Sequence, residues 1–173
     1  MRKGFAVNLA RLFLVPALVA LCAGIVLAAG LVDFSASTPP SRVEERLATF
    51  ALNRSIAAHA PKTVNPLAAS FAAASAGLVL FRTHCVMCHG APGVDPTEAG
   101  ASLNPPAPGL TLPRVQKRPD GELFYIVSHG IKMTGMPSFS GARSDQEIWE
   151  LVAALRHLPR LTDEEKRQLR ASD

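Results

Sequence analysis

Cys85-Val86-Met87-Cys88-His89 is the stretch of the chain that decides its fold. The C-x-x-C-H spacing is the attachment sequence of a covalently bound c-type haem. Two cysteines three residues apart on one turn can each add to a different vinyl group of one porphyrin. The next residue, a histidine, then presents its imidazole to the iron from the same turn. The motif therefore predicts one covalent haem c, bound through Cys85 and Cys88, with His89 as an iron ligand.

Other kinds of site also use a C-x-x-C pair. A zinc site would need a second pair of cysteine or histidine ligands, yet the only other cysteine is Cys22, which lies in an apolar run. A thioredoxin-like protein would need a βαβ context, and the sequence shows no strand pattern. One alternative outside haem chemistry stays open, a copper(I) site that adds Met133 and Met136 to the cysteines and histidine of the motif.

A candidate for the second iron ligand lies in the loop Thr134-Gly-Met-Pro-Ser-Phe139. Met136 stands between a glycine, which allows close approach, and a proline, whose φ is fixed. We therefore expect the thioether of Met136 to be held toward the iron. Met133 lacks the proline and is a weaker candidate. His129 would give bis-histidine ligation, which lowers the reduction potential relative to His/Met ligation.

The N-terminal part of the chain contains one long apolar run. Residues 12–32 are 21 residues without a charged side chain, enough at about 1.5 Å per residue to cross about 30 Å of hydrocarbon. Arg2, Lys3 and Arg11 precede the run and Asp33 follows it, so the positive-inside rule places the N-terminus in the cytoplasm. The sequence thus predicts a single membrane span with the rest of the chain outside, and a cleaved signal peptide is the alternative.

Composition divides the chain into three parts. We expect a cytoplasmic stub and membrane anchor at 1–34, a linker with a short helix at 35–66, and a haem domain at 67–173. The formal net charge is +4 and the pI is 9.3. Residues 78–173 hold eleven basic and eleven acidic side chains, so the excess lies in the N-terminal part. Neither this charge nor any motif predicts a nucleic-acid partner.

Helical periodicity predicts the secondary structure of the remainder. A short, weakly packed helix is expected over 42–60, with Val43, Leu47 and Phe50 recurring on one face. A stronger helix should lead into Cys85. The segment 90–118 is rich in glycine and proline and is predicted to be loop around the cofactor. Three further helices should follow, and their starts are indicated by Asp120 as an N-cap and by the capping-box pairs Ser144/Glu147 and Thr162/Glu165. The apolar face of the helix before Cys85 is predicted from residues at helical spacing, namely Leu67, Phe71, Ala74, Leu78 and Phe81.

The order of these features resembles the class I cytochromes c, and within them the membrane-anchored bacterial forms. A helix ends in the haem motif, a proline-bearing loop follows, and a Met-Pro loop precedes the last strong helix. The resemblance covers about residues 67–160 and implies an all-α cytochrome c fold. It carries the haem-binding roles onto Cys85, Cys88, His89 and Met136. It also implies that a loop carbonyl, of Pro106 or Pro108, accepts the N–H of the proximal imidazole.

The resemblance implies an electron carrier with one haem and His/Met ligation, on the periplasmic face of the bacterial cytoplasmic membrane. Its partners would be a protein redox donor and acceptor, with no small-molecule substrate and no nucleic acid. Two alternatives stay open. The first alternative is a haem-bearing subunit fixed in a respiratory or dehydrogenase complex, which an exposed apolar face on 42–60 would favour. The second is a five-coordinate haem enzyme or sensor, which requires that Met136 does not bind the iron.

Overall fold

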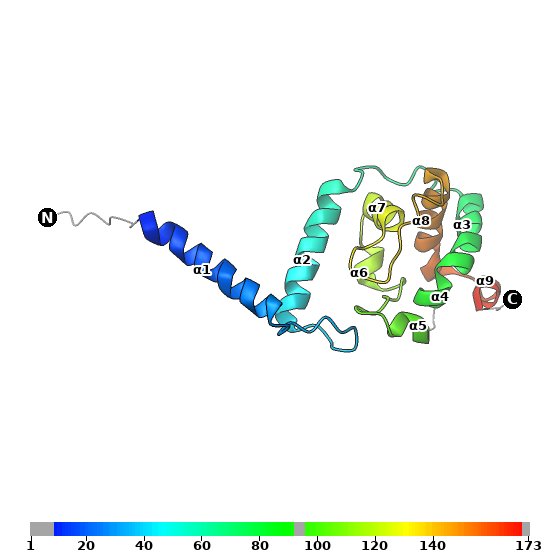
Figure 1. Cartoon of the computed structure of the whole chain (residues 1–173). Helices are drawn as coiled ribbons and strands as arrows, with labels where there is room; N and C mark the ends of the chain where they lie inside the picture. The colour runs from blue at the N-terminus through cyan, green and yellow to red at the C-terminus, as the bar shows by residue number, and fades with distance from the viewer. Residues whose placement is uncertain (1–8, 92–95, 171–173) are drawn as a thin grey trace. The chain divides into compact units, whose positions relative to one another are not determined.

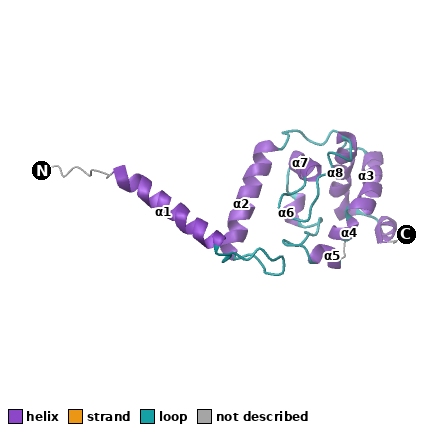
Figure 2. Cartoon of the chain, viewed as in Figure 1, coloured by secondary structure: helices purple, strands orange, loops and turns teal. Residues whose placement is uncertain are grey.

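The computed structural model describes residues 9–91 and 96–170, and over those residues it contains helices and loops but no strand (Figure 2). This confirms the all-α prediction for the described chain. The chain divides into two compact units, Met1–Thr38 and Pro39–Asp173. The sequence placed segment 35–66 outside the haem domain, whereas the structure groups most of it with that domain.

Within its described residues, the first unit contains one helix, α1, Leu9–Ala28 (Figure 1). The helix ends through backbone hydrogen bonds from Gly30 N to Leu27 O at 3.1 Å and from Leu31 N to Val26 O at 3.2 Å, with Gly30 at φ 67°. It therefore stops before the end of the run 12–32. No helix within the described residues is long and apolar enough to cross a membrane, so the predicted transmembrane helix is not supported.

Helix α2, Arg42–His59, belongs to the second unit and lies against α7, Asp120–His129. Ser41 caps it by accepting a hydrogen bond from Glu44 N at 3.2 Å. Its contact with the domain is made near its C-terminal end, where Ile56 is buried. The apolar face predicted from the sequence is not covered, because Val43, Leu47 and Phe50 are 64–67% exposed.

The chain between α2 and α3 is fastened to the domain by polar contacts. Asn65 is 4% exposed; its side-chain amide donates to Trp149 O at 2.9 Å, and its backbone N donates to Asp120 Oδ2 at 3.1 Å. Nearby, Gly121 passes so close to the backbone of Pro61 that a Cβ on the glycine would lie 1.8 Å from the proline oxygen. The sequence predicted a linker here, but this segment packs against the rest of the second unit.

The core of the domain is the crossing of α3, Phe71–His84, and α8, Asp145–His157. Gly77 of α3 makes the close approach possible, because a Cβ there would lie 2.0 Å from Glu150 O. The capping box of Ser144 and Glu147 is present as predicted. The side chains buried most completely are Phe81, Ile148, Leu151, Val152 and Leu158. Of the predicted face of α3, Phe71 is 71% exposed, so the buried stripe begins further along the helix.

The other helices are short, and they include two that the sequence did not predict. Helix α4 is Val86–His89, followed in the predicted loop by α5, Glu98–Ala101, and α6, Pro113–Gln116. The prediction that Asp120 caps α7 is wrong: Pro119 occupies the N-cap, and Asp120 is the first helical residue. The last described elements are a 3-10 turn, Leu158–Arg160, and α9, Asp163–Arg170, and α9 begins with the expected Thr162/Glu165 capping contacts.

Asp120 has a different role, and it supports a prediction. Its Oδ1 accepts a hydrogen bond from Arg156 Nε at 2.8 Å and lies 2.7 Å from Arg156 Nη2, in a half-buried ion pair. We expect Asp120→Asn to lower the free energy of unfolding by about 1–3 kcal/mol, because the arginine loses its charged partner. Denaturant unfolding should show a much smaller loss, about 0.3–0.5 kcal/mol, for Glu122→Gln, which breaks an i,i+4 pair with Arg118. Equal losses would contradict this account.

Candidate functional site

The three residues of the haem motif lie on one turn. Helix α3 ends at Cys85, where Cys85 N donates to Phe81 O at 2.8 Å, and α4 then carries Cys88 and His89. Gly90, at φ 68°, ends α4 and donates from its backbone N to Val86 O at 3.0 Å. Both cysteines are free thiols and half-buried. The local backbone therefore presents two thiols and an imidazole from one short element.

The first thiol is protonated at neutral pH. Burial, with a smaller contribution from the neighbouring Cys88, raises the pKa of Cys85 to about 12. A thiol in this form is a poor ligand for a soft metal ion, which binds thiolate. It still carries the S–H that adds across a vinyl double bond, a reaction without a leaving group. The Cys85 thiol thus carries the hydrogen that thioether formation requires.

The imidazole of His89 is oriented by a single hydrogen bond. Its Nδ1 lies 2.8 Å from Pro108 O, and because a carbonyl only accepts, Nδ1 carries the proton. Burial lowers the pKa of His89, so the ring is neutral and its Nε2 keeps a free lone pair. The sequence left two carbonyls open for this role; the structure selects Pro108 and not Pro106. The hydrogen bond to Pro108 O sets the plane of the His89 ring and its tautomer, as hydrogen-bond partners of ligating histidines do.

Residues 97–107, in the segment predicted to be loop, are linked by hydrogen bonds to one another and to the backbone of the haem motif. Thr97 Oγ1 donates to Met87 O and accepts a hydrogen bond from Gly100 N at 3.2 Å. Gly100 O in turn accepts from Ala107 N at 2.9 Å, in the chain that leads to Pro108. In the sequence, Thr97 before Glu98 indicates a helix start. Helix α5 has only four residues, too few for a hydrophobic period to confirm it.

Gly100 gives a direct test of this packing. A Cβ at this position would lie 1.8 Å from Cys88 O, which is backbone of the haem motif. We expect Gly100→Ala to lower the free energy of unfolding by about 1–3 kcal/mol and to reduce the yield of covalently attached haem. Pyridine haemochrome absorbance per protein measures the yield. Ala99→Gly, at the exposed neighbouring position, should leave the yield unchanged; equal yields for both variants would contradict the packing role.

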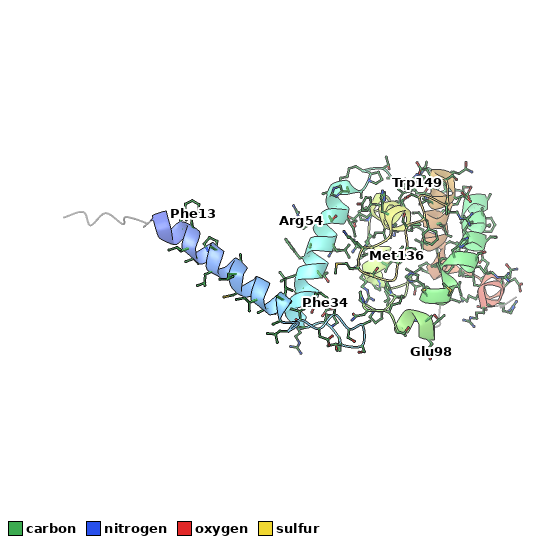
Figure 3. The ribbon with its side chains drawn as sticks, viewed as in Figure 1. Phe13, Phe34, Arg54, Glu98, Met136 and Trp149 are labelled. Atoms are coloured by element: carbon green, nitrogen blue, oxygen red, sulfur yellow. The ribbon has the colours of Figure 1, made fainter. Side chains whose placement is uncertain are left out.

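Met136 lies in a closed loop after α7, and Figure 3 labels it there. Ile131 N donates to Met136 O at 3.2 Å, and Met136 N donates to Thr134 Oγ1 at 3.2 Å. Gly130, at φ 66°, is needed at the start of the loop, because a Cβ there would meet the backbone of Met136 and Pro137 at 2.6 Å. Met136 is half-buried and packs against the same hydrophobic core as Cys85.

The two rival ligands lie elsewhere. Met133 is 86% exposed and has φ 62°. His129 is exposed; its Nδ1 lies 3.1 Å from Tyr125 O and its ring stacks on that of Tyr125 at 4.3 Å between centroids. The structure therefore places Met136, and neither rival, against the core that the haem motif shares. That Met136 binds the iron remains a prediction.

The donor set fits a c-type haem. It consists of two free thiols, an imidazole with its Nε2 lone pair available, and a half-buried thioether, which are the attachment and His/Met ligation groups of such a haem. Partly buried apolar side chains line the same core, namely Leu78, Leu80, Val86, Leu110, Phe124 and Phe139. Within residues 9–91 and 96–170, no group of three or more His, Cys, Asp or Glu side chains could hold a metal ion.

Part of the chain is similar to known proteins. Residues 72–153 match the family described as cytochrome C oxidase, cbb3-type, subunit III. Among solved structures, cytochrome CL from the marine methylotrophic bacterium Methylophaga aminisulfidivorans MPT is similar at 21% identity and a TM-score of 0.42, over 79% of this chain and 85% of that one. Among curated proteins, no sequence matches this chain significantly.

Proposed function

Because the chain contains a class I monohaem c-type cytochrome domain whose cofactor is one covalent haem c, we propose that it is an electron-transfer protein with His89 and Met136 as axial ligands. The hydrogen bond from His89 Nδ1 to Pro108 O carries the proposal. It fixes the tautomer that leaves Nε2 for the iron, and it joins the haem motif to the loop that the family resemblance implied.

The bound haem would supply a one-electron change between ferric and ferrous iron. The protein's part is to hold the ligands still, because electron transfer is fast when the site changes little between the two states. His89 is held by Pro108, and the Met136 loop is closed by its own backbone bonds between positions 131 and 136. Two protein ligands would leave no open position for a substrate, which favours a carrier over an enzyme.

The experiment that tests the function is a potentiometric titration of the holoprotein, followed by a peroxidase assay. An electron carrier should titrate reversibly with one electron per haem and should turn over hydrogen peroxide no faster than free ferric haem. Irreversible titration with rapid peroxide turnover would instead indicate an open iron and contradict the carrier function.

We also propose that the haem domain works on the periplasmic face of the cytoplasmic membrane and that residues 12–32 attach it there. The support is the uncharged run, preceded by Arg2, Lys3 and Arg11 and followed by Asp33. Protease added to spheroplasts should cleave the haem domain while the membrane is intact; protection of the domain would place it inside and overturn this location.

One observation favours a second candidate, a haem-bearing subunit fixed in a respiratory or dehydrogenase complex. Helix α2 leaves Val43, Leu47 and Phe50, which recur at helical spacing on one face, 64–67% exposed. A freely moving carrier has no need of such a face. Blue native electrophoresis of solubilised membranes, stained for haem, would show the chain in a large complex if this candidate is right and as a small species if it is not.

A further inference from the structure

One pair of side chains ties the end of α3 to the loop that carries Met136. Arg143 Nη2 lies 2.6 Å from His84 Nε2, and because a guanidinium only donates, His84 Nε2 is the acceptor. His84 is the residue before Cys85, so the bond reaches the haem motif itself. Arg143 Nη1 also donates to Glu147 Oε1 at 3.2 Å, which fixes the guanidinium from the side of α8.

Phe139 joins this contact from the loop side. Its ring lies edge-on to that of His84, with centroids 6.1 Å apart and an interplanar angle of 60°. Its backbone N donates to Ser128 O at 3.1 Å, and its O accepts from Arg143 N at 2.8 Å. Phe139 is thus held by α7 on one side and by His84 and Arg143 on the other, three residues after Met136.

We propose that His84 and Arg143 are positioning residues for Met136, and that their hydrogen bond sets how often the Met136 sulfur leaves the iron. The inference rests on the proposed His89/Met136 ligation. The bond is half-buried, with the Arg143 side chain 29% exposed, and its donor is charged. Such a bond is stronger than one between neutral groups in water. Its loss should therefore increase the mobility of the loop that carries Met136.

Imidazole binding to the ferric holoprotein tests this, because imidazole reaches the iron only while the sulfur is off it. We expect His84→Leu to raise the binding rate about tenfold, the equivalent of one charge-assisted hydrogen bond. His84→Gln keeps a carbonyl that can accept from Arg143, so it should restore most of the wild-type rate. Thr83→Val is the matched control: Thr83 is exposed, bonds only within its own helix, to Val79 O at 3.0 Å, and should not change the rate.

A double-mutant cycle separates the pair from unrelated effects. Arg143→Leu, which removes the donor, should speed imidazole binding to a similar degree, and adding His84→Leu to it should produce little further change. Wild-type rates in both single variants, or effects that add independently, would overturn the proposal. So would a loss of unfolding stability without a change in the rate, because it would leave the pair a purely structural role.

Failure of the underlying ligation would look different. If the wild-type ferric protein lacks the charge-transfer band that a methionine sulfur gives haem iron, then the His/Met ligation is wrong and the inference falls with it. If the band is present and the variants bind imidazole as the wild type does, then only the positioning role is wrong.

Discussion

Gly77→Ala should destabilise the protein by about 3 kcal/mol or more, although the same change at an exposed helical position stabilises by about 1 kcal/mol. The reason is the crossing of α3 and α8, where a Cβ on Gly77 would lie 2.0 Å from Glu150 O and 2.9 Å from the Cβ of Ala154. Neither neighbour can move aside by a rotamer change, because one is backbone and the other has no side-chain rotamers. The helices must therefore separate, and the buried contacts around Ile148 and Leu151 loosen.

Chemical denaturation of the holoprotein measures the effect, with Ala76→Gly as the matched control. Ala76 is the exposed neighbour on the same helix, so the control should lose only its helix propensity, about 1 kcal/mol. The two changes have opposite expected signs from propensity alone. A Gly77→Ala protein that is more stable than the wild type would therefore contradict the close crossing described here.

Met136→Ala should lower the reduction potential by on the order of 0.2 V, a fraction of the roughly 0.8 V range over which axial ligands set haem potentials. A thioether stabilises ferrous iron relative to ferric iron, and water or hydroxide in its place favours the ferric state. The open position should also give the variant peroxidase activity that the wild type lacks. Potentiometric titration and a peroxide assay on the same samples measure both effects.

Met133→Ala is the control for this prediction. Met133 is 86% exposed and its φ of 62° is equally unfavourable for methionine and for alanine, so the potential should stay at the wild-type value. If Met133→Ala lowers the potential and Met136→Ala does not, then the assignment of the two methionines is reversed. If neither changes it, His129 is the candidate that remains from the sequence.

Features encoded within a few residues could be predicted. The haem motif depends on five consecutive residues, and each capping box on a pair three residues apart, so Ser144/Glu147 and Thr162/Glu165 behave as the sequence indicated. The helix before Cys85 was also predicted, and of the five residues expected on its apolar face only Phe71 is exposed. Which residues of that face α8 covers depends on how the two helices cross, and the periodicity of α3 does not specify that crossing.

Features set by tertiary contact could not be predicted. Pro106 and Pro108 look alike in sequence, and only the folded loop brings the Pro108 carbonyl to His89. Helices α5 and α6 have four residues each, too few for a period, and they are held by contacts such as Thr97 with Met87. The partnership of His84 with Arg143 joins residues 59 apart, which no local pattern reveals.

The optical spectrum of the purified holoprotein in both redox states tests the central claim most directly. The account predicts a c-type α band in the ferrous form and, in the ferric form, the methionine–iron charge-transfer band, with the latter lost in Met136→Ala and kept in Met133→Ala. A ferric spectrum without that band would contradict the His89/Met136 carrier and point to bis-histidine ligation or an open iron.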